Sequence, residues 1–451
     1  MSTRLIPFPT VDEISRHCRD ETEPDTVHIE VHLPGVVDTK RLRTAVREAL
    51  ERHPRILVRQ SAPRWWHRRY RWELLPAPDT DPVVRLGGTL AAARRRAMTD
   101  SPPLTGSPPL RIEVLEPDDP GSTAGGTVLL VTLNHVALDG PACLRVLATA
   151  AERYGGADNA PAPAPVRGTS APQVPKTAPG GSPWERPARI AGERTAQGAP
   201  EPGNGMHLAA LPLPTRPRGA PWTVNDQLLV ATCLTSVRWN EEHGRRAHPV
   251  RVTMPVDDRP RTADMPIGNG TRLVEVMFGG EARLPRGAAT QRDGIERLLR
   301  ATALRTRALK AAPRPPLGFS GDLLTAPLLP VGARAAGVRT LRAAAGPWAS
   351  TTLLSNLGRL AYPLDFGDAG RAAAVWVSAP ARMPRGLSVT TVSTGGRLHL
   401  ALRWSRALLD DDAGRRLGTL FAECLAATAP PPSGPRHPSA PQAQRPRSGG
   451  A

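Results

Sequence analysis

The chain has 451 residues, which is long enough for two domains or one large one. Hydrophobic residues make up 40% of it and aromatic residues only 4%, so the core must rely on Leu, Val and Ala. No apolar run approaches the ~20 residues that a membrane-spanning helix needs. The first 19 residues also lack the apolar stretch of a signal peptide. We therefore expect a soluble, cytoplasmic protein with no membrane span.

A formal net charge of +18 would normally suggest a nucleic-acid partner. Lys40, Lys176 and Lys310 are the only lysines, however, and most arginines are scattered singly with no interleaved aromatics. That bias is typical of a GC-rich genome, as in actinobacteria, so we predict no nucleic-acid partner. A positive field still suits an anionic partner, such as a phosphorylated coenzyme or an acidic carrier protein. A charge-driven nucleic-acid role is kept as an alternative, and it predicts affinity that falls steeply with salt.

The four cysteines, Cys18, Cys143, Cys233 and Cys424, lie far apart and form no CxxC pair. We therefore expect buried free thiols, with no disulfide framework and no metal site. HExxH, GxSxG and GxxxxGK[ST] motifs are also absent from the sequence, so metalloprotease, serine hydrolase and P-loop functions have no support.

Composition divides the chain into four parts. Residues 157–203 are rich in Pro, Ala and Gly and are predicted to be a linker, and the same bias predicts a disordered tail at 430–451. A patterned N-terminal lobe at 1–156 precedes the linker, and a patterned C-terminal lobe at 204–429 lies between the linker and the tail.

The N-terminal lobe alternates strand and helix patterns. Apolar residues at every second position, or in consecutive positions, predict strands or extended stretches at 26–33, 56–58, 70–75, 111–115 and 127–133. Helical spacing of apolar residues predicts helices at 38–52, 90–98 and 140–154, the first of them capped by Asp38.

The C-terminal lobe repeats this alternation. Strand patterns lie at 250–255, 272–278, 350–354, 373–377, 387–393 and 398–404, and helical patterns at 224–241, 291–309 and 410–427. Thr223 and Asp226 have the spacing of a capping box, and an acidic run begins the last helix. The sequence therefore predicts two α/β halves joined by a linker.

The sharpest local feature is Asn134-His135-Val136-Ala137-Leu138-Asp139-Gly140, between a buried strand and a helix. A neutral imidazole at His135 suits a general base, because its ordinary pKa of ~6.5 lets it take and return a proton near neutrality. We expect Asp139 to hold the loop through a hydrogen bond or an arginine, and Gly140 to permit a tight turn into the helix. By itself this pattern also fits a structural loop histidine.

Further segments carry a resemblance. His53-Pro54-Arg55, Asn225-Asp226-Gln227-Leu228-Leu229, Pro255-Val256-Asp257-Asp258-Arg259, Gly268-Asn269-Gly270 and Ser355-Asn356-Leu357-Gly358 follow in an order and spacing that chance rarely gives. Together with 134–140, which resembles the HHxxxDG signature, they are similar to the chloramphenicol-acetyltransferase-like acyltransferases and peptide-synthetase condensation domains. The resemblance covers most of the chain outside linker and tail, and points to a stand-alone enzyme.

The resemblance implies two related α/β lobes in a V with a substrate tunnel between them. It implies an acyltransferase that joins a thioester-bound acyl group to a hydroxyl or amine acceptor in specialised-metabolite biosynthesis, such as that of an antibiotic. The acyl group is carried by coenzyme A or by the phosphopantetheine arm of a carrier protein, and no further cofactor or covalent acyl-enzyme is required. His135 corresponds to the general base and Asp139 to a structural aspartate.

Two features leave alternatives open. Asn134 replaces the first histidine of the signature, which motivates a second hypothesis: a catalytically inactive protein that binds a carrier protein or recruits a partner enzyme. Four other residues are candidates for the tunnel wall or for donating to an oxyanion, although each also fits an ordinary turn: Asn269, Thr271, Ser355 and Asn356.

Overall fold

The computed structural model describes residues 4–20, 22–116, 126–162, 184–195, 201–283, 288–311 and 318–430. Residues 163–183 and 196–200 of the predicted linker lie outside the described residues, as do residues 431–451 of the predicted tail. Within the described linker, Ala188, Ile190 and Ala191 are buried in the core of the second half of the molecule. The boundaries proposed for the lobes and the linker stay a prediction.

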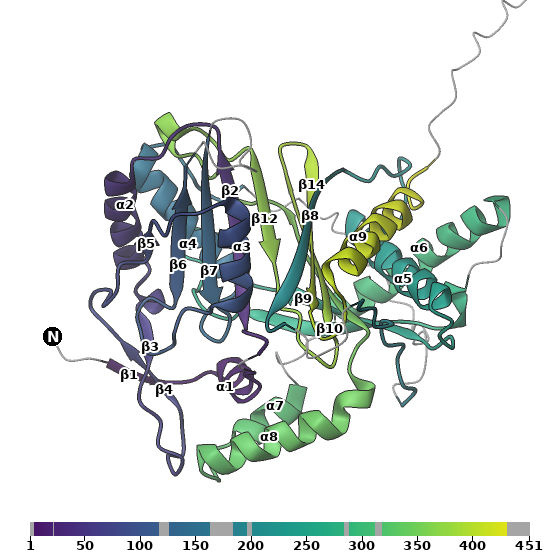
Figure 1. Ribbon diagram of the computed structural model, residues 1–451, viewed down its shortest axis with the longest axis horizontal. Coiled ribbons are helices and arrows are strands. Elements are labelled where there is room, and N and C mark those ends of the chain that lie inside the picture. Colours follow the sequence, from purple (N-terminus) through teal and green to yellow (C-terminus); the bar gives the residue numbers. More distant parts are fainter. Residues whose placement is uncertain are drawn as a thin grey trace, which may run out of the picture.

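The first half of the molecule is a five-stranded sheet with helices on both faces (Figure 1). In spatial order its strands are β12 (Ala374–Ser378), β2 (Thr26–Leu33), β7 (Thr127–Asn134), β6 (Leu110–Leu115) and β5 (Val83–Val84). The covering helices are α2 (Thr39–Arg52), α3 (Leu90–Thr99) and α4 (Gly140–Gly155).

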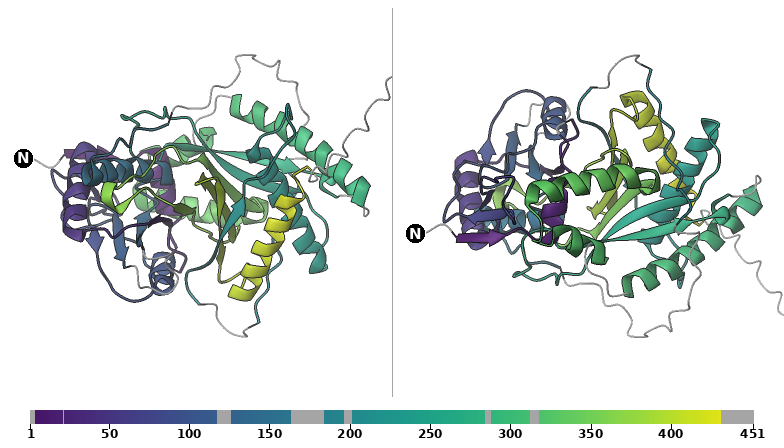
Figure 2. Two further views of the ribbon diagram at one scale, coloured as in Figure 1. Left: turned by 90° about the horizontal axis from the view of Figure 1, so that it is seen from above. Right: turned by 90° about the horizontal axis from the view of Figure 1, so that it is seen from below.

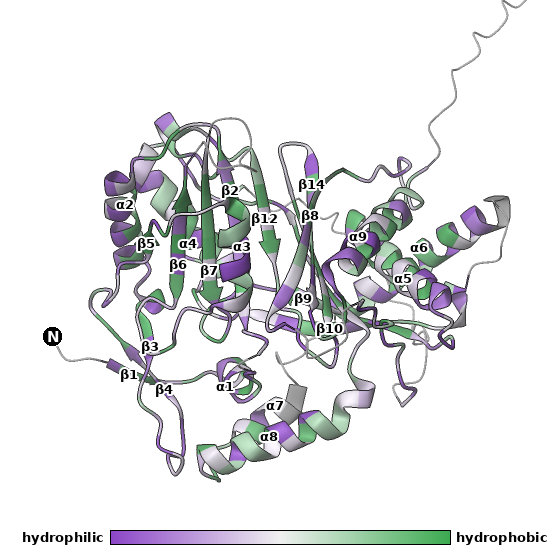
Figure 3. Cartoon of the chain, in the orientation of Figure 1, coloured by the Kyte–Doolittle hydropathy of each residue, from purple (hydrophilic) through white to green (hydrophobic). Residues whose placement is uncertain are grey.

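Strand β7 explains this layering. Its consecutive apolar residues alternate between faces, so Leu129 and Val131 join the core under α2 and α4, while Val128 and Leu130 pack with α3. Figure 3 shows the resulting hydrophobic centre of the sheet. Helix α2 begins where the sequence predicts. The Asp38 carboxylate caps it by accepting hydrogen bonds from the backbone amides of Lys40 and Arg41.

The second half is a six-stranded sheet. Its strands are β10 (Thr271–Phe278), β9 (Val250–Asp257), β11 (Thr352–Arg359), β13 (Leu387–Thr394), β14 (Arg397–Ser405) and β8 (Asn204–Pro212). Its helices are α5 (Val224–Glu242), α6 (Ala288–Ala311) and α9 (Asp411–Ala426). Thr223 and Asp226 form the predicted capping box at the start of α5, and Asp410 caps α9.

The two halves are joined by more than chain connectivity. Strand β12 comes from the C-terminal part of the chain but pairs with β2 in the first sheet, antiparallel, with Trp376 opposite Glu30. The buried guanidinium of Arg403 in β14 donates to the carbonyl and hydroxyl oxygens of Thr26 in β2. This arrangement confirms the predicted α/β fold of two lobes.

A smaller layer completes the molecule, and the sequence patterns missed most of it. It contains a sheet of β1 (Arg4–Pro7), β4 (Arg71–Leu74) and β3 (Val58–Gln60), with the helices α1 (Thr10–His17), α7 (Gly318–Thr325) and α8 (Val331–Ala345). Helices α7 and α8 pack beside α1 on the side where the halves meet (Figure 2).

The extended stretch predicted at 56–58 is wrong in part. A 3-10 helix, η1 (Pro54–Ile56), comes before β3, because the proline ring fixes a φ that suits its first turn. The other 3-10 helices are η2 (Gly280–Ala282), η3 (Gly346–Trp348) and η4 (Gly367–Ala369). None of the helices in the described ranges has both the length and the apolar character to cross a membrane.

Candidate active site

A cavity of about 760 Å³ lies where the two halves meet. The first half contributes His135, Asp139 and Gly140 to its wall, and the second half contributes Asn269, Thr271, Ser355 and Asn356. The structure therefore brings seven of the eight sequence-predicted site residues to one cavity, and Asn134 lies behind its wall. A volume of this size suits a small-molecule substrate.

The imidazole of His135 has a defined tautomer. This residue follows the last residue of β7, where its backbone amide donates to the Asp25 carbonyl over 2.8 Å. Its Nδ1 lies 2.9 Å from the carbonyl oxygen of Leu138, which can only accept, so Nδ1 carries the proton in the neutral ring. The unprotonated Nε2 has no protein partner among the described residues and is left available at the cavity wall.

Asn134 shapes the loop from a buried position. Its Oδ1 accepts from the backbone amide of Val136 over 3.1 Å. Its Nδ2 donates to the Ser101 hydroxyl over 3.1 Å and to the Pro102 carbonyl over 2.9 Å. The side chain thus uses donors and acceptor together to fix the turn that presents His135.

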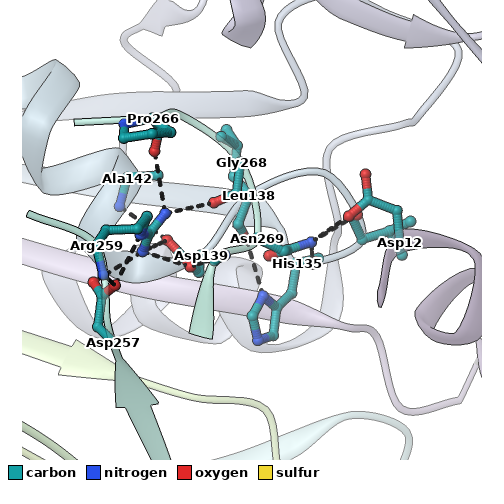
Figure 4. A network of polar contacts seen from close by, with 12 residues as sticks. Asp12, His135, Leu138, Asp139, Ala142, Asp257, Arg259, Pro266, Gly268 and Asn269 are labelled. Atoms are coloured by element: carbon teal, nitrogen blue, oxygen red, sulfur yellow. Dashed lines mark hydrogen bonds and ion pairs between the residues drawn. The ribbon is translucent and has the colours of Figure 1, made fainter. Parts of the chain in front are cut away.

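Asp139 is held as a structural group. Its Oδ1 caps α4 by accepting from the Ala142 amide, and its Oδ2 accepts from the Gly270 amide, both over 2.9 Å. Arg259 Nη2 lies 3.0 and 2.8 Å from the two carboxylate oxygens, and Arg259 also contacts Asp257 (Figure 4).

Four hydrogen bonds from three donor atoms occupy the Asp139 carboxylate, which leaves it a structural group and not a proton-transfer group. Burial alone would lower the pKa of Arg259, but its hydrogen bonds with Asp257 and the charge of Asp139 raise that pKa above its usual value. The guanidinium is therefore a permanent positive charge. The sequence predicted that an arginine could hold Asp139 but did not identify which one.

Asn269 links the histidine loop to α1, a helix that the sequence analysis did not predict. Its Nδ2 donates to the carbonyl oxygens of His135 and Val136 over 3.1 and 3.0 Å, and to Asp12 Oδ1 over 2.9 Å (Figure 4). Trp72 Nε1 donates to the other Asp12 oxygen over 2.9 Å. Burial raises the pKa of Asp12 to about 6, although these hydrogen bonds oppose the rise.

The remaining candidates differ in what holds them. Asn356 is engaged by the protein: its Oδ1 accepts from the Gly358 amide and the Thr391 hydroxyl, and its Nδ2 donates to Asn225 Oδ1. The hydroxyl of Ser355 has no hydrogen bond within the described part of the chain. Of the two, Ser355 is the better placed to donate to a substrate.

The prediction that Gly140 is needed for a tight turn into the helix is wrong. Its φ is not in the left-handed region, so the chain needs no glycine there to turn. A Cβ at this position would meet only Val377 at 3.5 Å and Val27 at 3.9 Å, which are ordinary contacts. Since Gly140 lines the cavity, the absence of a side chain there keeps the space beside His135 open.

Metal ligands are not assembled anywhere in the ranges that the structure describes, where no group of three or more His, Cys, Asp or Glu side chains could hold an ion. Of the four thiols, Cys143, Cys233 and Cys424 are buried as expected, whereas Cys18 is half-buried and lines the cavity.

Comparisons with known proteins were made by sequence and by structure. No family model matches the chain. Uncharacterized proteins from two strains of Mycobacterium tuberculosis are 27% identical to it over 431 residues, covering 89% of this chain and 94% of theirs.

Several solved structures share the fold. The condensation domain of the monacolin K polyketide synthase MokA has a TM-score of 0.60 and 14% identity, covering 94% of this chain and 98% of that one. The trichothecene 15-O-acetyltransferase TRI3 of Fusarium sporotrichioides has a TM-score of 0.61 and 12% identity, with 95% of each chain covered. The starter condensation domain of rhizomide synthetase RzmA, in complex with C8-CoA and Leu-SNAC, has a TM-score of 0.60 and 13% identity, with 94% of each covered. The chain thus has the fold of condensation domains and related acyltransferases.

Proposed function

We propose that the protein is an acyltransferase, which moves an acyl group from a thioester to a hydroxyl or amine acceptor in specialised-metabolite biosynthesis. The observation that carries this proposal is the orientation of His135. Its Nδ1 proton is committed to the Leu138 carbonyl, so its basic Nε2 is free at the wall of a cavity of about 760 Å³. The fold shared with condensation domains and an acetyltransferase supports this proposal.

In the proposed reaction, the acceptor O–H or N–H gives its proton to His135 Nε2 as the acceptor attacks the thioester carbonyl carbon. The carbonyl oxygen becomes an oxyanion, for which the Ser355 hydroxyl is the candidate donor. The C–S bond then breaks, and the leaving thiolate takes the proton back from the imidazolium. The proton balance closes within one turnover, so no covalent acyl-enzyme and no further cofactor are required.

Asp139 and Asn269 support this step without touching the substrate's reacting atoms. Asp139 caps the start of α4 and is itself held by Arg259, and Asn269 donates to the carbonyl oxygens of His135 and Val136. A base whose loop is already fixed by hydrogen bonds loses little entropy when the transition state forms. Positioning is therefore the role that we assign to both residues.

The donor is a thioester of coenzyme A or of a carrier-protein phosphopantetheine arm. A panel of acyl-coenzyme A and acyl-pantetheine donors, combined with mixed amine and alcohol acceptors, tests the proposal. Thiol release that depends on the acceptor, with the acylated acceptor found by mass spectrometry, is the expected result. Thiol release that ignores the acceptor would instead indicate a thioesterase and contradict the proposal.

The alternative is an inactive protein that binds a carrier protein, as the replacement at Asn134 first suggested. The hydrogen bonds of Asn134 to Val136, Ser101 and Pro102 favour activity over this alternative, because they maintain the loop that presents His135. Tight binding of a carrier protein, combined with no turnover of any acyl group loaded on it, would favour the alternative.

A further inference from the structure

Arg385 is a partly buried cation at the cavity wall with no carboxylate beside it. It precedes β13 and lines the cavity, and its only hydrogen bond within the described residues runs from Nε to the Ser350 hydroxyl over 3.0 Å. That hydroxyl is itself buried and accepts from Thr253 Oγ1 over 2.7 Å. Within the described residues, Arg385 has neither an ion pair nor a hydrogen bond from its two terminal nitrogens, so these nitrogens remain available at the cavity wall.

More arginines surround this one. Arg342 and Arg382 line the same part of the cavity, and both donate to the Cys18 carbonyl, over 2.9 and 3.0 Å. Arg342 also donates to the Met383 carbonyl, and Arg189 donates to the carbonyl oxygens of Ala349 and Pro384. These carbonyl partners are neutral, and among the described residues only Arg382 of these three arginines also pairs with a carboxylate.

Four acidic groups lie near the cluster. Asp20 interacts electrostatically with Arg342, and Glu23 accepts from the Met383 amide. Asp25 pairs with Arg382 over 3.3 Å, and its charge also acts on the buried Arg403. Glu275 acts on Arg385 from a distance and pairs with Arg251 over 3.8 Å. Burial lowers the pKa of Arg385 to about 10, and the charge of Arg382 adds to the lowering. Arg385 is nevertheless protonated at neutral pH, so this part of the cavity wall is positively charged.

A partly buried cation without a counterion is unfavourable, and proteins usually pair such a group or use it to bind a ligand. A guanidinium fork matches the oxygens of a carboxylate or phosphate group, to which it can donate two parallel hydrogen bonds. We propose that Arg385, flanked by Arg342 and Arg382, binds an anionic oxygen group of a substrate, a carboxylate or a phosphate, inside the cavity. This inference rests on the proposed function only in calling the bound ligand a substrate.

Direct binding tests this inference without requiring turnover. The probes are two matched pairs, coenzyme A against pantetheine for a phosphate, and octanoate against octanamide for a carboxylate. Calorimetry on the 451-residue protein should give at least about tenfold tighter binding of the anionic member of one pair. The pair that shows the preference identifies which substrate group the arginine recognises.

Two substitutions assign the preference to Arg385. Arg385→Gln should remove it, and Arg385→Lys should retain part of it. Arg300→Gln is the matched control, because Arg300 is an exposed helical arginine paired with Glu296, and this variant should bind like wild type. Equal affinity of the wild type for both members of each pair, absence of binding, or an unchanged preference in Arg385→Gln would overturn the inference.

Thermal unfolding gives an independent readout. Without ligand, Arg385→Met should melt at a higher temperature than wild type, because it removes a partly buried charge that lies near Arg382 and Arg342 and has no carboxylate partner. The anionic probe should then raise the melting temperature of wild type but not of this variant. A lower melting temperature of free Arg385→Met would make Arg385 a structural residue and overturn the inference. Anion binding through Arg385 in a protein that releases no thiol would contradict only the proposed function.

Discussion

Arg259 Nη2 lies 3.0 and 2.8 Å from the two carboxylate oxygens of Asp139, and so joins the connection between β9 and β10 to the first turn of α4. Both side chains are almost fully buried. The pair therefore links the two halves of the molecule directly beneath the histidine loop, and Gly270 reinforces the link by donating to the same carboxylate.

Asp139→Asn should destabilise the protein by about 3–5 kcal/mol, because removing one partner leaves a buried charge short of compensation. Urea unfolding measures this loss. Asp368→Asn is the matched control, since the Asp368–Arg41 pair is largely exposed and should be worth at most about 1 kcal/mol. A similar loss in both variants would contradict a special structural role for Asp139.

Asn134→Ala should lower the free energy of unfolding by about 1–3 kcal/mol, because the Val136 amide and the Pro102 carbonyl both lose their partner. Its kcat should fall far less than that of a variant lacking the imidazole, since the base itself remains. Steady-state kinetics and unfolding of the same preparation check both statements. If Asn134→Ala matched wild-type stability, the loop would not depend on this side chain.

Asp12 makes stability depend on pH. Its pKa is about 6 in the folded protein instead of the model-peptide value of 3.8, so the folded state binds this proton more tightly than the unfolded chain does. The stabilisation is complete below about pH 4 and is lost as the pH rises through 6. Its full extent is roughly 3 kcal/mol.

The difference in unfolding free energy between wild type and Asp12→Asn isolates this contribution, because other carboxylates titrate equally in both proteins. As the pH falls from 7 to 4, the free energy of unfolding of wild type should rise relative to that of the variant. A difference that stays constant, or that shrinks on acidification, would show that the pKa of Asp12 is not raised.

Cys18 should be the one thiol that reacts quickly in the native protein. It lines the cavity, whereas the other three cysteines are buried, and burial raises the pKa of Cys143 to about 12. Titration with a disulfide reagent should label one thiol quickly, and Cys18→Ser should abolish that phase. Rapid labelling of Cys143 would show instead that α4 opens from the core.

The sequence predicted best those elements whose bounds are set by residues close together in the chain. The bounds of α2, α5 and α9 follow closely from Asp38, the Thr223–Asp226 box and Asp410, because a cap acts within one turn. Strand β8 escaped prediction, since its side chains are only partly buried along most of its length and its partner β14 lies almost two hundred residues away.

The site shows the same division. Asn134, His135 and Asp139 lie in one loop, so a short motif identified them together. Asp12 and Arg385 act through contacts with Asn269 and Ser350 that only the tertiary fold creates. Nothing in the sequence separates Arg385 from the many other arginines, because what distinguishes it is its place at the cavity wall, where its terminal nitrogens have no acceptor among the described residues.

The central claim is that His135 is the base of an acyl transfer, and one comparison tests it most directly. Acceptor-dependent thiol release should be measured for wild type and His135→Ala with the same donor and acceptor, after circular dichroism has shown that both are folded. We predict that kcat falls by about 10²–10⁴-fold in the variant while its melting temperature stays close to that of wild type. Undiminished acceptor-dependent release by folded His135→Ala would contradict the account.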